Sequence, residues 1–558
     1  FGVLVAATLL AQGLVQAALP EIVMTAERIE LGDMSITSVS GRLAAEGRLE
    51  VTGEALELAA WSEPVESLSL LCPQWSAAGA GYCANGEWSF VMGGLRSDHG
   101  ASRISGMIDG IDLAGDSVAL NGRVALEGLR AGITVQSFSD RLQVQLEWID
   151  QPLKSLQAFA MSPPQMMWLS RGSSDGSIEL LLPESGDPLL DYDFRLTDLS
   201  FDSPEGRFAG EGLQLSSLGS LRLGEAYAAE ITGQVSSGEL LLDDFYRDFA
   251  DAAMDFGVKP GWAGPLVIFD EILLTDHTAF NLQGRAEFDP GAGENPLSFT
   301  VSNLELDFPG AYHRYVEPIA TIFTLDGLEV TGGIRWSGEW ENGVFESGEL
   351  RVDDLTIVDL QRDRFAVTGL EARMRPGDHD FESSLNWRGL LLGPVNLGPA
   401  NLKLDSAPGR VALTQELSLD VLGGQLIFEQ FAIDLPRRID RLEEDLDIAL
   451  RARMQSMDME LLTKAMGWPA FSGDISGVIP AVSFDDGVLS VDGEIRFDVF
   501  DGSIALSELR VERPFGVLPS LAANIEIYDL DLEQVTNTFS FGQIGGRLDG
   551  YLKDLRML

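Results

Sequence analysis

The sequence predicts a mainly β protein built on one long, antiparallel, strongly twisted β-sheet, and three observations support this prediction. From Glu21 onward, apolar and polar residues alternate with a period of two, and Gly, Asp or Asn interrupt the alternation at short intervals. The 60 Gly residues suit frequent tight turns and bulges. Strand-like runs follow one another with few helical runs between them, which disfavours parallel βαβ folds.

The alternation places apolar side chains on one face of the sheet and charged side chains on the other. In the run 190–196, Leu190, Tyr192, Phe194 and Leu196 share one face, and the polar residues between them share the other. The run 488–499 repeats this pattern, with Asp492-Gly493 as a predicted turn. Four more segments alternate in the same way: Leu402/Leu404, Val411/Leu413, Leu417/Leu419/Val421 and Leu426/Phe428.

A few short segments have the three- and four-residue apolar spacing of helices. One of them carries Phe245, Phe249, Ala252 and Phe256 at such a spacing. We expect short helices over Pro152–Met161, Leu241–Phe256, His313–Phe323, Met459–Met466 and Leu530–Phe539.

The first residues of the chain, Phe1–Leu19, contain no charged side chain and are followed by Pro20. As a helix they would rise about 28 Å, close to the roughly 30 Å thickness of a bilayer core. We expect residues 1–20 to form an N-terminal apolar helix that is either a transmembrane anchor or a signal segment cleaved near Val15-Gln16-Ala17. Both alternatives place the body of the protein outside the cytoplasm. The opening Phe1 and the missing basic flank suggest that the sequence lacks its natural start.

Composition limits the classes of function. With 38 Lys and Arg against 87 Asp and Glu, the formal net charge is −49. No basic run is present, so nucleic acid is not an expected partner. Such an acidic surface indicates a strongly solvated exterior.

Two cysteines, Cys72 and Cys83, flank a turn-rich stretch. In an exported chain this spacing predicts a disulfide that closes a hairpin, and the alternative is two buried thiols. The pair lacks a nearby His or a second Cys pair, so no zinc site is expected.

No convincing catalytic motif is present, and we expect a protein that is not an enzyme and that needs no cofactor and no metal. The four His residues are isolated from one another, and no Walker A motif occurs. Gly172-Ser173-Ser174-Asp175-Gly176 fits G-x-S-x-G, but a strand-like run follows it where a nucleophile elbow needs a helix. We interpret this motif as a turn.

The C-terminal part contains residues specific enough to suggest a family. The stretches are Ala465–Gly473, Ile479-Pro480, Asp486–Gly493, Val499–Ser503, Asp529–Thr536, Phe539–Gly550 and Leu555-Arg556. Together they resemble the YdbH-like branch of the AsmA-like proteins of Gram-negative envelopes. That family's closing segment continues further, so we expect Leu558 to be a second truncation.

The resemblance implies a U-shaped β-groove whose hydrophobic inner face carries phospholipid between the inner and outer membranes. It implies an inner-membrane anchor, a periplasmic body and a small outer-membrane lipoprotein as partner. We expect segments 1–20 (anchor or signal), 21–150 (first part of the groove with the cysteine hairpin), 151–460 (central groove) and 461–558 (the incomplete YdbH-like segment). The expected groove lining comprises Tyr192, Phe194, Leu413, Leu419, Phe428, Val491, Ile495 and Phe497, with Asp193, Asp420, Asp492 and Asp498 facing outward.

Two other classes of protein remain open. A secreted structural or adhesive β-protein would alternate in the same way, and so would an outer-membrane β-barrel without lipid-carrier activity. Regular short repeats would indicate the first class and aromatic girdles the second. Neither feature is evident in the sequence.

Overall fold

The computed structural model describes residues 21–557 apart from a set of short gaps. The gaps are 32–33, 59–64, 77–81, 93–101, 115–116, 127–128, 139, 156–168, 225, 244, 290, 292–296, 321–325, 378–380, 435–446, 486–487 and 513–519. The expected N-terminal helix therefore lies outside the described residues. None of the described helices is long and apolar enough to cross a membrane. The chain divides into two compact units, Phe1–Gly264 and Pro265–Leu558, and the division falls inside the segment 151–460 expected from the sequence.

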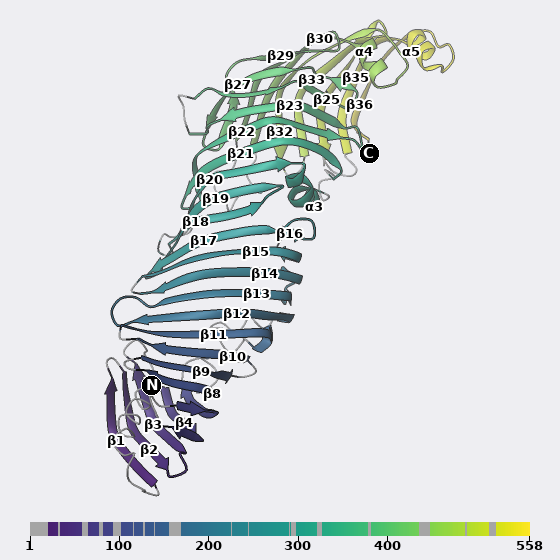
Figure 1. Cartoon of the computed structure of the whole chain (residues 1–558). Helices are drawn as coiled ribbons and strands as arrows, with labels where there is room; N and C mark the ends of the chain where they lie inside the picture. The colour runs from purple at the N-terminus through teal and green to yellow at the C-terminus, as the bar shows by residue number, and fades with distance from the viewer. Residues whose placement is uncertain are drawn as a thin grey trace. The chain divides into compact units, whose positions relative to one another are not determined.

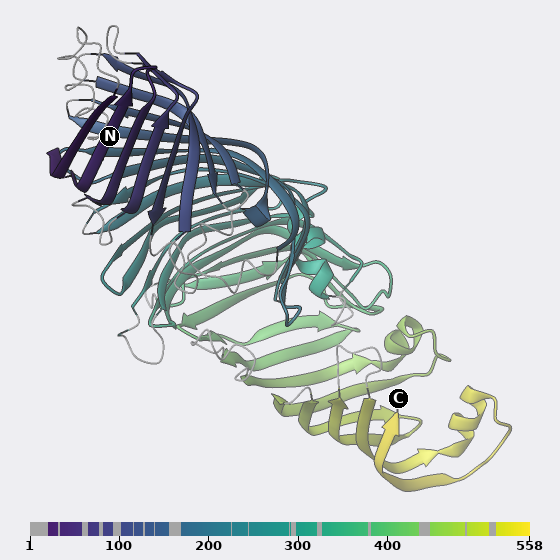
Figure 2. The same cartoon turned by 90° about the horizontal axis from the view of Figure 1, so that it is seen from below.

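The first unit is an antiparallel sheet in which each main strand pairs with the next along the chain. Strand β4 skips a small hairpin to pair with β7, and β15 pairs with both β16 and β17. Figure 1 shows β8 to β15 stacked in chain order, and Figure 2 shows these blue and teal strands bending along their length. The strands are β1 (Glu21–Leu31), β2 (Met34–Ala44), β3 (Leu49–Leu58), β4 (Val65–Cys72), β5 (Gln74–Ser76), β6 (Tyr82–Ala84), β7 (Gly86–Met92), β8 (Ser102–Ala114), β9 (Ser117–Leu126), β10 (Leu129–Ser137), β11 (Arg141–Pro152), β12 (Leu169–Pro183), β13 (Leu189–Asp202), β14 (Phe208–Leu223), β15 (Tyr227–Leu242), β16 (Phe245–Asp248) and β17 (Met254–Ala263).

The second unit is also an antiparallel sheet in which most strands pair with the next along the chain, with short helical segments between some of them. The order is interrupted between β23 and β30, because β23 pairs with both β24 and β25, β24 pairs with β27, and β28 and β29 both pair with β30. Its strands are β18 (Leu266–Asp276), β19 (Phe280–Phe288), β20 (Leu297–Phe308), β21 (Leu328–Glu341), β22 (Val344–Asp359), β23 (Phe365–Met374), β24 (Ser383–Trp387), β25 (Gly389–Leu392), β26 (Val395–Asn396), β27 (Ala400–Ala407), β28 (Arg410–Leu413), β29 (Leu417–Val421), β30 (Gly424–Asp434), β31 (Asp447–Asp458), β32 (Gly473–Asp485), β33 (Val488–Val499), β34 (Gly502–Glu512), β35 (Ser520–Asp531) and β36 (Arg547–Met557). Its helical segments are the π-helical turn η2 (Tyr312–Val316), α3 (Glu317–Ala320), α4 (Met459–Ala465) and α5 (Leu532–Phe539).

Three of the five expected helices are confirmed, and their ends follow from local chemistry. η2 and α3 occupy the described part of His313–Phe323, and α4 and α5 occupy the two C-terminal segments. The side chains of Asp458 and Asp531 cap α4 and α5, because each accepts hydrogen bonds from two backbone N–H groups of the first turn. α5 ends at Ser540, whose left-handed backbone terminates the helix.

The helix expected over Leu241–Phe256 is wrong. This segment contains the end of β15, β16 and the start of β17, because Leu240–Leu242 complete the hydrogen-bonded ladder with β14. The apolar spacing instead reflects Phe249, which is 1% exposed among side chains of β14, β15 and β17. Of the helix expected over Pro152–Met161, the described residues form one 3₁₀ turn after β11.

Two predicted turns are strands in the structure. Gly172–Gly176 lies inside β12, and Asp492-Gly493 forms a bulge inside β33, where the two residues oppose the single residue Glu508 of β34. A turn and a bulge both use Gly with an unusual backbone, so the sequence does not separate them.

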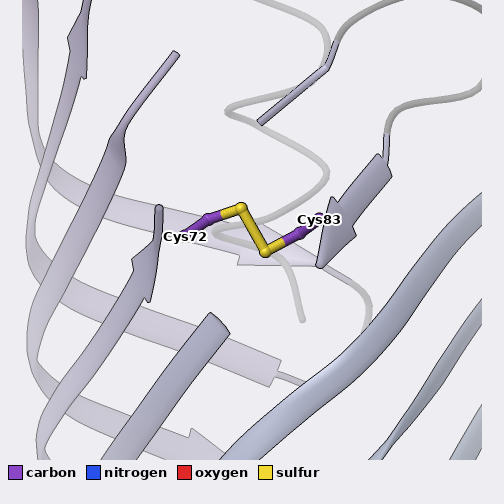
Figure 3. Close-up of a disulfide and its surroundings, with 2 residues drawn as sticks. All are labelled: Cys72 and Cys83. Atoms are coloured by element: carbon purple, nitrogen blue, oxygen red, sulfur yellow. A yellow bond between two sulfur atoms is a disulfide. The ribbon is translucent and has the colours of Figure 1, made fainter. Parts of the chain in front are cut away.

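The predicted disulfide is confirmed. Cys72 ends β4 and Cys83 lies in β6, with their Cα atoms 5.9 Å apart (Figure 3). Both side chains are buried in a cluster with Ile36, Val51 and Ile108. The bond therefore ties the small β5–β6 hairpin to the core of the first unit.

Candidate functional site

The first unit has one apolar face that is continuous from strand to strand. A row of directly opposed residues crosses the sheet from β7 to β17, and every member is apolar or Gly. The row is Gly86, Ile108, Gly122, Ile133, Leu146, Ile178, Tyr192, Gly219, Ile231 and Val258. At about 4.8 Å per strand, its nine steps span roughly 43 Å. We call the face that carries this row the apolar face of the first unit.

Neighbouring rows extend this face, and the alternate positions form a polar one. Leu120, Val135, Val144, Leu180, Leu190, Leu221 and Ala229 are opposed in a second apolar row. The positions between the two rows point the other way and are Asn121, Thr134, Gln145, Glu179, Asp191, Ser220 and Glu230. The two faces therefore differ in character across many strands.

Large aromatic rings on the apolar face lie over Gly residues of the adjacent strand. A Cβ added at Gly176 would come within 2.8 Å of the Trp148 ring and 2.9 Å of Phe194 Cβ, and one at Gly219 within 2.7 Å of the Tyr192 ring. Real Cβ atoms do not approach this closely, so these positions are restricted to Gly. Rings that lie along the sheet cover the backbone and fill the gap that Gly leaves.

A recurrent bulge explains why the alternation changes phase within many strands. In many strands one residue has a positive φ, and the apolar residues before and after it then lie on the same face although they are three positions apart. An example is Leu196-Thr197-Asp198-Leu199, in which Asp198 has the positive φ. The same device occurs at Ser67, Asp354, Ser456, Glu508, Asp529 and Asp554. A bulge bends its strand, and in β11 to β15 the irregularities lie at adjacent places in successive strands. We expect this series to be the reason that the strands curve.

Part of the apolar face is packed, and the rest is only half-buried. In the first unit, Phe249 covers Leu213 and Val235. In the second unit, Tyr312 likewise covers Leu328 and Val330, and α4 and α5 contact the cluster around Ile475. By contrast, no such cluster contains Val144, Leu180, Leu190 or Ile231, which are all half-buried. These segments therefore leave the half-buried part of the apolar face uncovered.

Near its first strands, the apolar face of the first unit forms an open pocket of about 260 Å³. It is lined by side chains from β2 to β10, among them Ile36, Val51, Leu70, Ile133 and Val135. In a flat sheet β2 and β10 would lie roughly 29 Å apart, across six strand spacings, which is too far to line one pocket of this size. The sheet must therefore curl toward its apolar face here.

The second unit has a comparable apolar face. Phe280, Leu306, Ile334, Val352, Ala372, Leu385 and Leu402 form one row, and Leu419, Leu426, Met454, Gly477, Ile495, Leu506, Ile525 and Leu552 form another. Aromatic stacking extends the face, since the ring centroids of Phe299 and Trp340 are 4.5 Å apart.

The residues expected to line a groove all lie on these apolar faces. Tyr192 and Phe194 stack on one another in the first unit, with ring centroids 4.9 Å apart. In the second unit each expected residue opposes apolar residues or Gly: Leu413 opposes Leu404, Leu419 opposes Leu426, Phe428 opposes Leu417 and Ala452, Val491 opposes Val482 and Leu509, Ile495 opposes Gly477 and Leu506, and Phe497 opposes Ile475 and Ile504. Asp193, Asp420, Asp492 and Asp498 are exposed. Their role in holding a lipid stays a prediction.

Leu419 differs from the other expected lining residues. It is 4% exposed and packs with Leu397 and Val421 in a small core. The alternation identifies its face correctly, but it does not reveal that neighbouring side chains already cover it. Tyr192 and Ile231, by contrast, are half-buried.

Two buried carboxylates, Asp276 and Asp359, fix turns in the second unit. The carboxylate of Asp276 accepts hydrogen bonds from Tyr315 Oη (2.8 Å) and Thr278 Oγ1 (2.9 Å), and Arg314 Nη1 lies 3.0 Å away. Burial alone would raise the pKa of Asp276, but the hydrogen bonds from Tyr315 and Thr278, together with the charge of Arg314, hold it below its usual value. These contacts fasten the η2 segment to the β18–β19 turn. The second carboxylate, Asp359, accepts a hydrogen bond from the N–H of Arg362 (3.1 Å) and pairs with Arg364, which fixes the turn after β22.

The serine of the G-x-S-x-G motif lies in a strand. Ser174 of the G-x-S-x-G motif is 1% exposed and accepts a hydrogen bond from Trp148 Nε1 at 2.9 Å. Its environment is that of a structural hydroxyl in a strand. Within the described ranges, no three His, Cys, Asp or Glu side chains lie close enough together to hold a metal ion.

Comparisons add no relative: the sequence matches no protein-family model, no curated protein and no solved structure. The arguments for function therefore rest on the sequence and on the geometry of the two sheets.

Proposed function

We propose that this protein carries phospholipids by holding their acyl chains against the apolar faces of its sheets. The observation that carries the proposal is the uninterrupted row from Gly86 to Val258. Its length of roughly 43 Å exceeds the thickness of one bilayer leaflet, about 15 Å, so more than one acyl chain fits along it.

The energetics favour such a surface. An acyl chain that leaves a membrane exposes methylenes to water at a cost of about 0.8 kcal/mol each. An apolar face that is continuous from strand to strand removes much of this cost at every step, because no polar row has to be crossed. The acidic, exposed side chains of the opposite face keep the protein solvated.

The resemblance of residues 461–558 to YdbH-like proteins extends the proposal to transport between the inner and outer membranes of a Gram-negative envelope. Residues 1–20 would anchor the chain in the inner membrane, the body would lie in the periplasm, and a small outer-membrane lipoprotein would be a partner. This transport would support lipid homeostasis of the outer membrane.

Two measurements test lipid carriage. Protein purified without detergent is extracted with organic solvent, and phospholipid is quantified by mass spectrometry. In parallel, a photoreactive amino acid replaces either Tyr192 or Asp193, which are neighbours on opposite faces. We expect co-purified phospholipid and a lipid crosslink from position 192 but not from 193.

The results also separate the proposal from the structural alternative. A protein that is folded by circular dichroism but contains no phospholipid would favour a structural or adhesive β-protein with a closed core. Equal crosslinking from both positions would show that the apolar face is not the binding surface.

A further inference from the structure

A second apolar surface lies where α4 and α5 end. It comprises the exposed side chains of Met466 and Trp468, which follow α4, and of Phe539, Phe541 and Ile544, which end and follow α5. Phe541 is 75% exposed, Ile544 53% and Trp468 51%. Phe471 links the two segments, because its ring centroid lies 6.1 Å from that of Phe539. We call this surface the C-terminal tip.

The tip is uncharged in a strongly acidic protein. The two segments that form it, 465–473 and 539–546, together contain 17 residues and no Asp, Glu, Lys or Arg. At the chain average of 22% charged residues, about four charges would be expected in 17 residues. Charged side chains are excluded most strongly from surfaces that enter hydrocarbon.

Local hydrogen bonds hold these side chains out in solvent. The N–H of Phe541 donates to the carbonyl of Thr536 (3.1 Å), the N–H of Ile544 to Thr536 Oγ1 (3.3 Å), and the N–H of Leu532 to the carbonyl of Gly546 (3.0 Å). After α4, the N–H of Trp468 donates to the carbonyl of Thr463 (2.8 Å). Both segments thus have bonded backbones that present apolar side chains outward.

The tip is continuous with the apolar face of the second unit. Phe471 packs on the cluster that contains Ile475, Phe500 and Leu530, and these residues belong to β32 and β35 and to the turn after β33. The ring centroids of Phe471 and Phe500 are 4.7 Å apart. An object bound at the tip would therefore lie next to that face.

From these observations we propose that the C-terminal tip inserts into the interfacial region of a lipid bilayer. Trp, Phe, Ile and Met on glycine-rich turns are suited to this region. Their apolar side chains can enter the bilayer while the neighbouring backbone stays in contact with water. The two segments are flanked by Lys464, Asp474 and Arg547 but contain no charged side chain themselves, so the surface they form offers a protein partner no ion pair. The inference does not depend on lipid carriage by the apolar faces.

The test uses the full chain and a local reporter, because the apolar segment of residues 1–20 can itself bind vesicles. Since both native cysteines are in a disulfide, Ile544→Cys can be labelled selectively with an environment-sensitive fluorophore. Leu218→Cys, at a residue that is 58% exposed on the polar face of the first unit, is the control. The probe is a phosphatidylcholine vesicle with or without a quencher on its acyl chains.

We expect quenching at position 544, little at 218, and no dependence on salt. In the labelled protein, Trp468→Ser and Phe541→Ser should each weaken vesicle binding at the tip by about tenfold, as expected for removing one large apolar side chain from the bilayer. Circular dichroism checks that each variant is folded.

Three results would overturn the proposal. They are an unquenched reporter at 544, quenching only with anionic lipid at low salt, or quenching that Trp468→Ser and Phe541→Ser leave unchanged. In envelope membranes, crosslinking from position 544 to protein alone would assign the tip to a protein partner instead. Quenching at position 544 of a protein that carries no co-purified phospholipid would support insertion of the tip into the bilayer and would contradict lipid carriage.

Discussion

The substitution Ile231→Asp tests whether the apolar face of the first unit holds acyl chains. Ile231 is half-buried and directly opposes Gly219 and Val258, and no packed cluster contains it. Its neighbour Thr232 is exposed on the other face, so Thr232→Asp adds the same charge one residue away. The pair of variants separates the effect of the face from the effect of charge.

The magnitude can be worked from the strand spacing. An acyl chain that passes one strand, about 4.8 Å, places roughly four methylenes beside it, of which about half the surface contacts the sheet. Losing this contact costs about 1.5 kcal/mol, so Ile231→Asp should lower phospholipid occupancy at this strand by about tenfold. Thr232→Asp should change occupancy little, because residue 232 lies on the other face of the sheet. It should also leave the fold intact, because surface substitutions usually alter stability by less than about 0.5 kcal/mol.

The assay is phospholipid per mole of detergent-free protein, measured by mass spectrometry, with circular dichroism and urea unfolding as checks of the fold. The assay is repeated with a short-chain phospholipid. Such a lipid covers only part of the row, so losing its contacts at one strand lowers its binding more strongly. Equal phospholipid content in the two folded variants would refute the reasoning, because the charge would then act regardless of face.

Three further predictions concern the architecture. Gly176→Ala should destabilise the first unit by about 1–3 kcal/mol in urea unfolding because its Cβ would meet the Trp148 ring, whereas Gly110→Ala, which has no atom within 4 Å of the added Cβ, should be tolerated; equal midpoints would contradict the fit. Ser456→Val should cost about 1–2 kcal/mol because φ is 49°, and Ser456→Gly should be neutral; the same unfolding midpoint for both would show that the bulge is not constrained. Asp276→Asn should cost about 3 kcal/mol near neutral pH by leaving Arg314 without its buried carboxylate. Because the native pKa of Asp276 is lowered, its contribution is complete above its unfolded value near 4 and is lost as the pH falls further, so the two midpoints should converge in acid; a constant difference would contradict this.

Much of the architecture could be predicted from local pattern. Period-two alternation identified the strands and the faces of Tyr192 and Phe194, and three of the five short helices were found by their spacing. The failure at Leu241–Phe256 shows the limit, because a helical spacing of apolar residues also arises when strands and a connecting loop fill one core. Phe249 reaches its cluster through tertiary packing, which local spacing does not encode.

The recurrent bulge has a sequence signature that period-two alternation alone does not capture. Motifs such as Leu196-Thr197-Asp198-Leu199 and Ile527-Tyr528-Asp529-Leu530 shift the apolar positions by one residue at an Asp with positive φ. Most of these bulges have apolar residues at positions i and i+3 and Asp or Ser at position i+2. The cost of the left-handed backbone explains why short polar residues predominate there.

Local patterns in the sequence were enough to predict antiparallel strands, a disulfide between Cys72 and Cys83, and the contrast between an apolar and a polar face. These features depend on local periodicity, on turn chemistry and on a short loop between two cysteines. The folded chain was needed to see which residues oppose one another, which glycines lie beneath aromatic rings, and which parts of the apolar faces are covered. The reason is physical: strand register and the packing of loops over a sheet are set by contacts between residues far apart in the chain, and a single sequence does not reveal those distances.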